Sequence, residues 1–197
     1  MINVISLGAL ICSLHNVIPS GSTTYNKYDC EERAQEYIEA AKTYDLDPLE
    51  LLAIDIHECN LRTDISLKYF KYKKNKNGRV VKQMTSIDLC PMGLRITKLN
   101  KNKYILKRKA IVDRSAKLLA QYKSYHNKQS SNKKKSHHYF GHYNWGYKIY
   151  NNGKHARYDD KVLNIYKQLK GEKPEPKDTR IISLINRIKR AQEECKK

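Results

Sequence analysis

The sequence has few acidic residues for its number of basic ones, and it lacks the paired-cysteine spacing of small metal-binding domains. Its 197 residues include 20 Asp and Glu against 39 Lys and Arg, so the formal net charge is +19. A field of this sign attracts polyanions such as nucleic acid, an anionic membrane or an anionic cell wall. No two of the five cysteines are separated by two residues, which argues against a zinc ribbon or a thioredoxin-like site.

Long apolar runs are also scarce: the one strongly apolar stretch near an end covers residues 1–19. It is too short for a stable membrane-spanning helix, which needs about 20 residues. Small residues follow at 20–22, so we predict a secretory signal peptide over residues 1–22 and a secreted, periplasmic or cell-wall location. A buried first segment of the fold is the alternative. Removal of the leader would leave four cysteines with three possible full pairings: Cys30, Cys59, Cys90 and Cys195.

Apolar side chains recur at helical spacing in most of the remaining chain, and 40% of the residues are hydrophobic. These patterns predict a mainly α domain over 30–170, with helices at 31–44, from 48, at 110–125 and at 159–169. Asn77 and Gly78 lie between two β-prone runs, which predicts a small β-hairpin within 67–89. Gly and Pro at 171–176 predict a linker, and 178–195 predicts a basic amphipathic C-terminal helix.

The helix that starts near Pro48 is expected to run through the centre of the domain. Asp47 and Glu50 form a capping-box pattern around Pro48, and residues 49–56 are apolar on nearly every side. Glu58 would therefore leave the core with part of its hydration removed, which raises the pKa of a carboxylic acid towards the range of a general acid. The alternative interpretation is that Glu58 caps the helix or forms a salt bridge.

Four segments in fixed order resemble the lytic transglycosylase and goose-type lysozyme superfamily. The segment YDLDPLELLAI at 44–54, which leads to Glu58, resembles the family helix Y-x-L-D-P-x-L-L-L-A that ends in Glu and Ser. SIDLCPMGLRI at 86–96 is similar to S-x-D-x-G-L-M-Q-I, YNWG at 143–146 to Y-N-x-G, and YDDKVL at 158–163 to Y-V-x-x-V-L. Cys59 replaces the family serine, and Arg95 is nearest to the place of the family glutamine.

This resemblance implies an α+β lysozyme-like domain that cleaves the β-1,4 bond between N-acetylmuramic acid and N-acetylglucosamine in peptidoglycan. Glu58 would be the catalytic acid and base, and the product would carry a 1,6-anhydro ring. The resemblance implies no metal and no cofactor. It assigns substrate binding to Cys59, Met92, Gly93, Leu94, Arg95, Tyr143, Asn144 and Tyr158. For Tyr158 the resemblance leaves two roles open, contact with Glu58 or with the 6-hydroxyl region of the sugar.

Two other functions remain open. A hydrolase would need a second carboxylate, for which Asp55, Asp64 and Asp88 are candidates. A binding protein on a degenerate lysozyme-like scaffold would use the Lys-rich segments 71–76 and 128–135 to hold an anionic wall polymer or nucleic acid. The absence of RRM, KH and zinc-finger patterns disfavours nucleic acid. We expect a monomer whose partners are peptidoglycan strands and other anionic wall polymers.

The sequence contains the start of a zinc-protease motif, but one residue of the motif differs. His57 and Glu58 begin an HExxH pattern, but Leu61 occupies the position of the second histidine ligand. His138 and His142 have helical ligand spacing without an acidic or cysteine partner close in sequence, so they do not predict a metal site.

Overall fold

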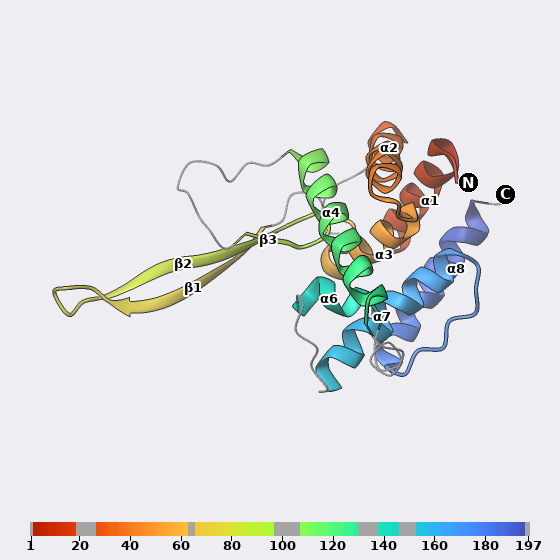
Figure 1. Cartoon of the computed structure of the whole chain (residues 1–197). Helices are drawn as coiled ribbons and strands as arrows, with labels where there is room; N and C mark the ends of the chain where they lie inside the picture. The colour runs from red at the N-terminus through yellow and green to blue at the C-terminus, as the bar shows by residue number, and fades with distance from the viewer. Residues whose placement is uncertain are drawn as a thin grey trace.

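The structure is a computed structural model that describes residues 2–18, 27–62, 66–96, 107–129, 138–145 and 153–195. It is mainly helical and carries one small antiparallel sheet, so the predicted fold class is confirmed at this level (Figure 1). The helices are α1 (Val4–Val17), α2 (Lys27–Tyr44), α3 (Pro48–Cys59), α4 (Arg108–Asn127), α6 (Phe140–Trp145), α7 (Gly153–Leu169), the short 3-10 helix η1 (Thr179–Ile181) and α8 (Ile182–Glu194). The strands are β1 (Ser66–Lys74), β2 (Val80–Leu89) and β3 (Leu94–Ile96).

Helix α3 starts as its sequence predicts and lies in the core. The Asp47 side chain accepts a hydrogen bond from the backbone N–H of Leu49 at 3.0 Å, and Glu50 completes the capping box. The helix is buried continuously from Leu49 to Ile56, and α2 and α7 pack against it. The left-handed conformation of Asn60 ends it directly after Glu58 and Cys59.

The hairpin predicted from Asn77 and Gly78 is confirmed. Strands β1 and β2 pair from Ser66 opposite Leu89 to Lys74 opposite Val80, and Gly78 adopts a positive φ of 73° in the turn. The ribbon projects away from the helices in Figure 1. The third strand, β3, pairs with the base of β2 and was not predicted, because three residues are too few to show an alternating pattern.

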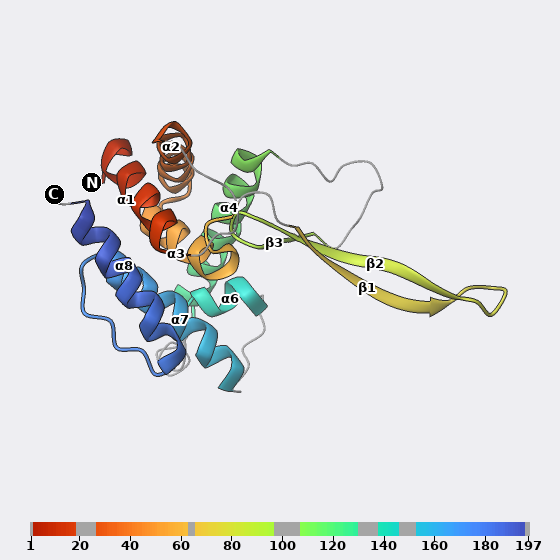
Figure 2. The same ribbon diagram turned by 180° about the vertical axis from the view of Figure 1, so that it is seen from behind.

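The first and last helices pack side by side in the same core as the rest of the chain (Figures 1 and 2). Leu7, Ile11 and Leu14 of α1 are fully buried, and a disulfide joins Cys12 to Cys30 of α2. The apolar run thus lies as a core helix in this structure, and its removal as a signal peptide stays a prediction. Helix α8, predicted as a segment beyond the domain, buries Ile185, Ile188 and Ala191 against this core.

None of the helices in the described ranges combines the length and the hydrophobicity that crossing a bilayer requires.

Candidate active site

Glu58 lies at the wall of a cavity of about 260 Å³ between α3, the small sheet, α4 and α6. Besides Glu58, its lining consists of Asp88, Gly93, Leu94, Arg95, Leu118, Tyr122, Tyr143 and Asn144. Helix α3 brings Glu58 to the cavity because Glu58 lies in its last turn, between the buried residues 49–56 and the helix end at Asn60. The cavity therefore combines two partly buried carboxyl groups, those of Glu58 and Asp88, with aromatic, amide and guanidinium groups that can bind a polar ligand.

The environment of Glu58 raises the pKa of its carboxyl group. Burial is the largest cause, and the nearby charge of Asp88 acts in the same direction. The hydroxyl of Tyr158 donates a hydrogen bond to Oε1 of Glu58 at 2.6 Å, which lowers the pKa, and Arg95 lowers it further. Because burial dominates, Glu58 holds its proton at higher pH than an exposed Glu does, as a general acid requires.

Gly93 approaches Glu58 so closely that no larger residue fits without movement. A Cβ added at Gly93 would lie 3.0 Å from Oε2 of Glu58 and 3.1 Å from its Cβ. Gly93 also has a positive φ of 62°, and Met92 before it has a φ of 70°. The turn between β2 and β3 is thus shaped to lie against the carboxyl group.

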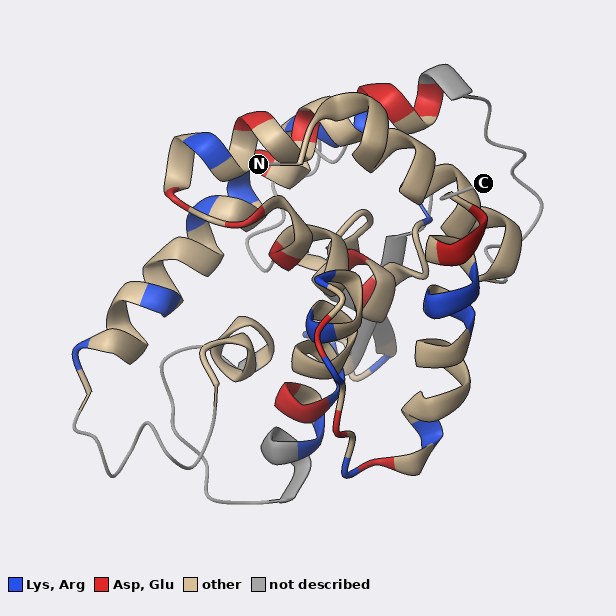
Figure 3. Ribbon diagram, turned by 90° about the vertical axis from the view of Figure 1, so that its right-hand side faces the viewer, with Lys and Arg blue, Asp and Glu red and all other residues tan. Residues whose placement is uncertain are grey.

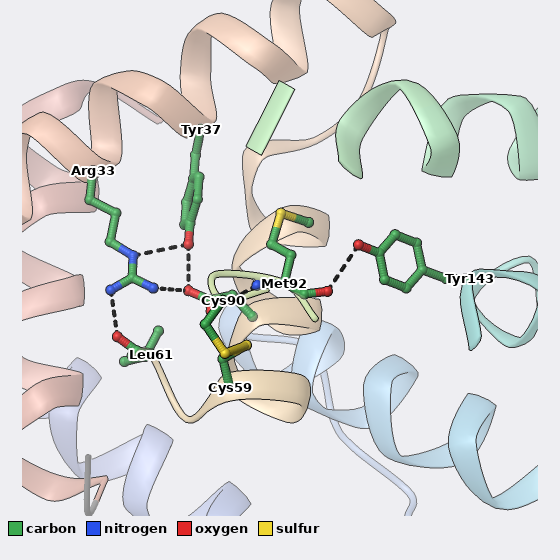
Figure 4. Close-up of a disulfide and its surroundings, with 8 residues drawn as sticks. Arg33, Tyr37, Cys59, Leu61, Cys90, Met92 and Tyr143 are labelled. Carbon is green, nitrogen blue, oxygen red and sulfur yellow. Dashed lines mark hydrogen bonds and ion pairs between the residues drawn. A yellow bond between two sulfur atoms is a disulfide. The ribbon is translucent and has the colours of Figure 1, made fainter. Parts of the chain in front are cut away.

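A buried network fastens this turn to α3 (Figure 4). A disulfide links Cys59, directly after Glu58, to Cys90, and Asp55 accepts a hydrogen bond from the backbone N–H of Met92 at 3.3 Å. On the cavity side, the hydroxyl of Tyr143 donates to the carbonyl of Met92 at 2.9 Å. The turn is therefore held covalently and by hydrogen bonds from both sides.

Asp55 is itself held by an ion pair that is closed to solvent. Arg33 of α2 pairs with Asp55 and donates to the carbonyl of Leu61 at 2.6 Å, and the hydroxyl of Tyr37 donates to the same carboxylate. The side chains of Arg33 and Asp55 are both 0% exposed. Asp55 is therefore occupied in holding the turn and does not face the cavity that Glu58 lines.

The structure brings six of the nine predicted site residues together around the cavity and places the other three behind it. The six that line the cavity are Glu58, Gly93, Leu94, Arg95, Tyr143 and Asn144. Cys59 is bound in the disulfide, the Met92 side chain is fully buried, and Tyr158 reaches Glu58 from α7. These three residues therefore hold the wall of the cavity or Glu58 in place and do not line the cavity themselves.

Three further residues line the cavity that the sequence analysis did not assign to substrate. Leu118 and Tyr122 come from α4, and they share one side of this helix with the buried residues Ile111 and Leu119. Asp88 stands opposite Arg95 in the β2–β3 register and accepts both ends of its guanidinium at 2.7 Å. Nothing in the local pattern of α4 separates a residue that packs in the core from one that lines a cavity at its edge.

The candidates for a second carboxylate are thereby reduced. Asp55 is buried with Arg33, and Asp64 lies outside the described residues. Asp88 lines the cavity, but its oxygens are engaged by Arg95. Among the residues that the structure describes, no group of His, Cys, Asp and Glu is arranged to hold a metal ion.

Comparison of the chain with known proteins found no matching family model, no curated protein similar in sequence and no solved structure similar in fold.

Proposed function

We propose that the protein is a lytic transglycosylase with a lysozyme-like fold, which cleaves the bond between N-acetylmuramic acid and N-acetylglucosamine in peptidoglycan. The observation that carries the proposal is the position of Glu58: a partly buried carboxyl group, with raised pKa, on the wall of a cavity lined by six other residues of the resembling motifs.

The first step needs an acid, and Glu58 suits it. Its carboxyl group protonates the glycosidic oxygen, the bond to the anomeric carbon breaks, and an oxocarbenium-like sugar forms. Glu58, now a carboxylate, takes the proton from the 6-hydroxyl of the muramic residue. The 6-oxygen closes onto the anomeric carbon, so no water is consumed and Glu58 ends protonated again.

The surroundings of Glu58 support both halves of this cycle. Burial favours the protonated acid at the start, while the Tyr158 hydroxyl at 2.6 Å stabilises the carboxylate that forms in the middle. In the proposal, Asn144 hydrogen-bonds the sugar and Tyr143 shapes the cavity wall, since both line it.

A hydrolase on the same fold is the second candidate, because Asp88 lines the cavity with Glu58. It would have to leave its ion pair with Arg95 to stabilise the cation or activate water. The engagement of Asp88 favours the lyase, which needs one carboxylate only.

The proposed location is outside the reducing cytosol, in the periplasm, the cell wall or the medium. The disulfide between Cys59 and Cys90 supports this location, since such bonds persist in oxidising compartments. The bond between Cys12 and Cys30 adds to this support only in a protein that keeps residues 1–22. The net charge of +19 would keep the enzyme near peptidoglycan and other anionic wall polymers.

Mass spectrometry of the products released from purified peptidoglycan tests the proposal. We expect 1,6-anhydro-muropeptides from the wild-type protein and from Glu172→Gln, which removes an exposed carboxylate as a control. Glu58→Gln should reduce release by a factor of about 10² to 10⁴. Reducing-end products would establish the hydrolase instead. An intact wall with all three proteins would reject an enzyme acting on this substrate and favour a wall-binding scaffold.

A further inference from the structure

The ribbon of β1 and β2 carries charge of one sign only. Residues 66–87, which comprise β1, the turn and most of β2, include seven Lys and Arg and no Asp or Glu. On the helices, in contrast, Asp and Glu are interspersed with Lys and Arg (Figure 3). We call residues 66–87 the basic arm. No carboxylate side chain within the basic arm can neutralise its cations.

The outer end of the basic arm exposes three of these cations. Lys74, Lys76 and Arg79 are all exposed. Within the described part of the chain, none of the ion pairs involves them. The arm projects away from the helices in both views of the fold, so its outer end lies far from the carboxylates of the helical body (Figures 1 and 2). The three charges are therefore available to an anionic partner.

Two large hydrophobic side chains are exposed beside the same cations. Tyr72 is 69% exposed and Val80 is 63% exposed. Val80 stands opposite Lys74 in the β1–β2 register, and Tyr72 precedes Lys74 by two residues. Side chains alternate along a strand, so Tyr72, Lys74 and Val80 lie on one face of the arm. An aromatic, an aliphatic and a cationic side chain on one exposed face is a combination typical of a membrane interface, where the rings lie at the level of the headgroups.

The turn at the end of the arm is held by its own hydrogen bonds. The side chain of Asn75 accepts from the backbone N–H groups of Asn77 at 3.0 Å and Arg79 at 2.9 Å. The backbone N–H of Asn75 donates to the carbonyl of Arg79 at 2.9 Å, and that of Gly78 donates to the carbonyl of Asn75 at 3.0 Å. The backbone that carries Lys76 and Arg79 is therefore ordered before any partner binds, which lowers the entropic cost of binding.

The inner end of the arm leads directly to the Glu58 cavity. Asp88, the residue after the arm, lines that cavity together with Leu94 of β3. Strand β1 has nine residues, and a strand rises about 3.3 Å per residue, so the arm is about 25–30 Å long. A surface bound at the outer end would thus lie roughly this far from the cavity.

We propose that the outer end of the basic arm binds the surface of an anionic phospholipid bilayer. Lys74, Lys76 and Arg79 would meet the lipid phosphates, while Tyr72 and Val80 would enter the headgroup layer. Hydrated polyanions such as a wall polymer or nucleic acid would attract the cations equally, but they offer no apolar layer to Val80. This inference goes beyond the proposed function and does not depend on cleavage at Glu58. Taken together, the two would hold the cavity away from the bilayer, where peptidoglycan lies.

Flotation with lipid vesicles tests the proposal. One set of vesicles is an equimolar mixture of phosphatidylglycerol and phosphatidylcholine, and the other is pure phosphatidylcholine. Each Lys or Arg near an anionic surface strengthens binding about fivefold, so K74Q/K76Q/R79Q should bind the mixed vesicles about 100-fold more weakly than the wild type. R187Q/K189Q/R190Q on α8 is the matched control, because it removes the same charge from another element and should keep most of the binding.

A second pair of variants tests the apolar contribution at unchanged net charge. Y72S/V80S should weaken binding to the mixed vesicles about tenfold, since less apolar surface is removed from water. Ile182→Ser is its control, because Ile182 is also exposed, at 44%, but lies outside the arm. Thermal melting checks that all variants keep the fold.

Equal losses in K74Q/K76Q/R79Q and R187Q/K189Q/R190Q would overturn the proposal, because net charge alone would then explain the binding. So would equal binding of the wild type to both kinds of vesicle, or unchanged binding by Y72S/V80S. Arm-dependent binding to duplex DNA or to a purified anionic wall polymer, without binding to the mixed vesicles, would assign the arm to that polymer and overturn the proposal. None of these results affects the release of products from peptidoglycan, which tests the proposed function separately.

Discussion

The hydroxyl of Tyr158, on α7, donates a 2.6 Å hydrogen bond to Oε1 of Glu58, which lies 100 residues earlier at the end of α3. The bond joins the two helices at the cavity and stabilises the charged form of a carboxyl group whose pKa burial raises. Two features of Glu58 thus have different origins. Helix α3 positions the side chain, and the hydroxyl of Tyr158 lowers the pKa of its carboxyl group.

Tyr158→Phe should move the pKa of Glu58 upward, because burial then acts without the opposing hydrogen bond. Activity that needs protonated Glu58 falls as pH rises through this pKa, so the alkaline limb of the pH–rate profile should shift to higher pH. A hydrogen bond to a charged group contributes about 1.5–3 kcal/mol, which is about one to two pH units. Tyr166→Phe, whose hydroxyl bonds Asp47 at 3.0 Å, is the control and should leave the limb in place. An unshifted limb in Tyr158→Phe would contradict the assignment.

Gly93→Ala should reduce activity far more than it reduces stability. Its Cβ would lie 3.0 Å from Oε2 of Glu58, so the carboxyl group has to move, and a displacement of this kind costs about 10²-fold in rate. Gly171→Ala is a matched control: its φ of 76° is equally unfavourable for alanine, but nothing lies within 4 Å of the added Cβ. Both variants should lose about 1–2 kcal/mol of unfolding free energy, because the left-handed conformation is unfavourable for alanine. Equal activities of the two variants would show that the contact with Glu58 is unimportant.

The two disulfides should differ in their effect on activity and agree in their effect on stability. They close loops of 31 residues (Cys59–Cys90) and 18 residues (Cys12–Cys30), so removal of either by Ser substitution should cost about 3 kcal/mol of unfolding free energy. Only Cys59 and Cys90 fasten the turn that lies against Glu58. At a temperature where both double variants are folded, the Cys59→Ser/Cys90→Ser protein should therefore be the less active. Product release and thermal melting measure the two effects, and activity lost only with Cys12 and Cys30 would refute this explanation.

Asp55→Asn should destabilise the protein by about 3–5 kcal/mol, since it leaves the buried charge of Arg33 without its counter-ion. Denaturant unfolding followed by circular dichroism measures the loss. Asp113→Asn, at an exposed carboxylate that accepts from Tyr44 at 3.2 Å, should unfold close to the wild type. If the unfolding free energy of Asp55→Asn equals that of the control, the ion pair between Arg33 and Asp55 does not stabilise the packing of α2 on α3.

Much of the secondary structure could be predicted because its causes are local. Asp47, Pro48 and Glu50 set the start of α3 through capping groups that lie within one helical turn. Asn77 and Gly78 set the hairpin turn, because Gly78 tolerates a positive φ. The exit of Glu58 from a buried helix follows from the same local pattern. The short strand β3 escaped this reasoning, because pairing with β2 defines it and its own three residues do not.

The sequence by itself thus determined the mainly helical class, the hairpin, and Glu58 as the carboxyl group at the end of the central helix. Only the tertiary structure decided what surrounds that group. The choice of cysteine partners, the place of α1 in the core and the meeting of α7 with η1 each depend on residues far apart in the chain. Periodicity and caps report the preferences of a few neighbouring residues, whereas such contacts result from the packing of whole helices around one core.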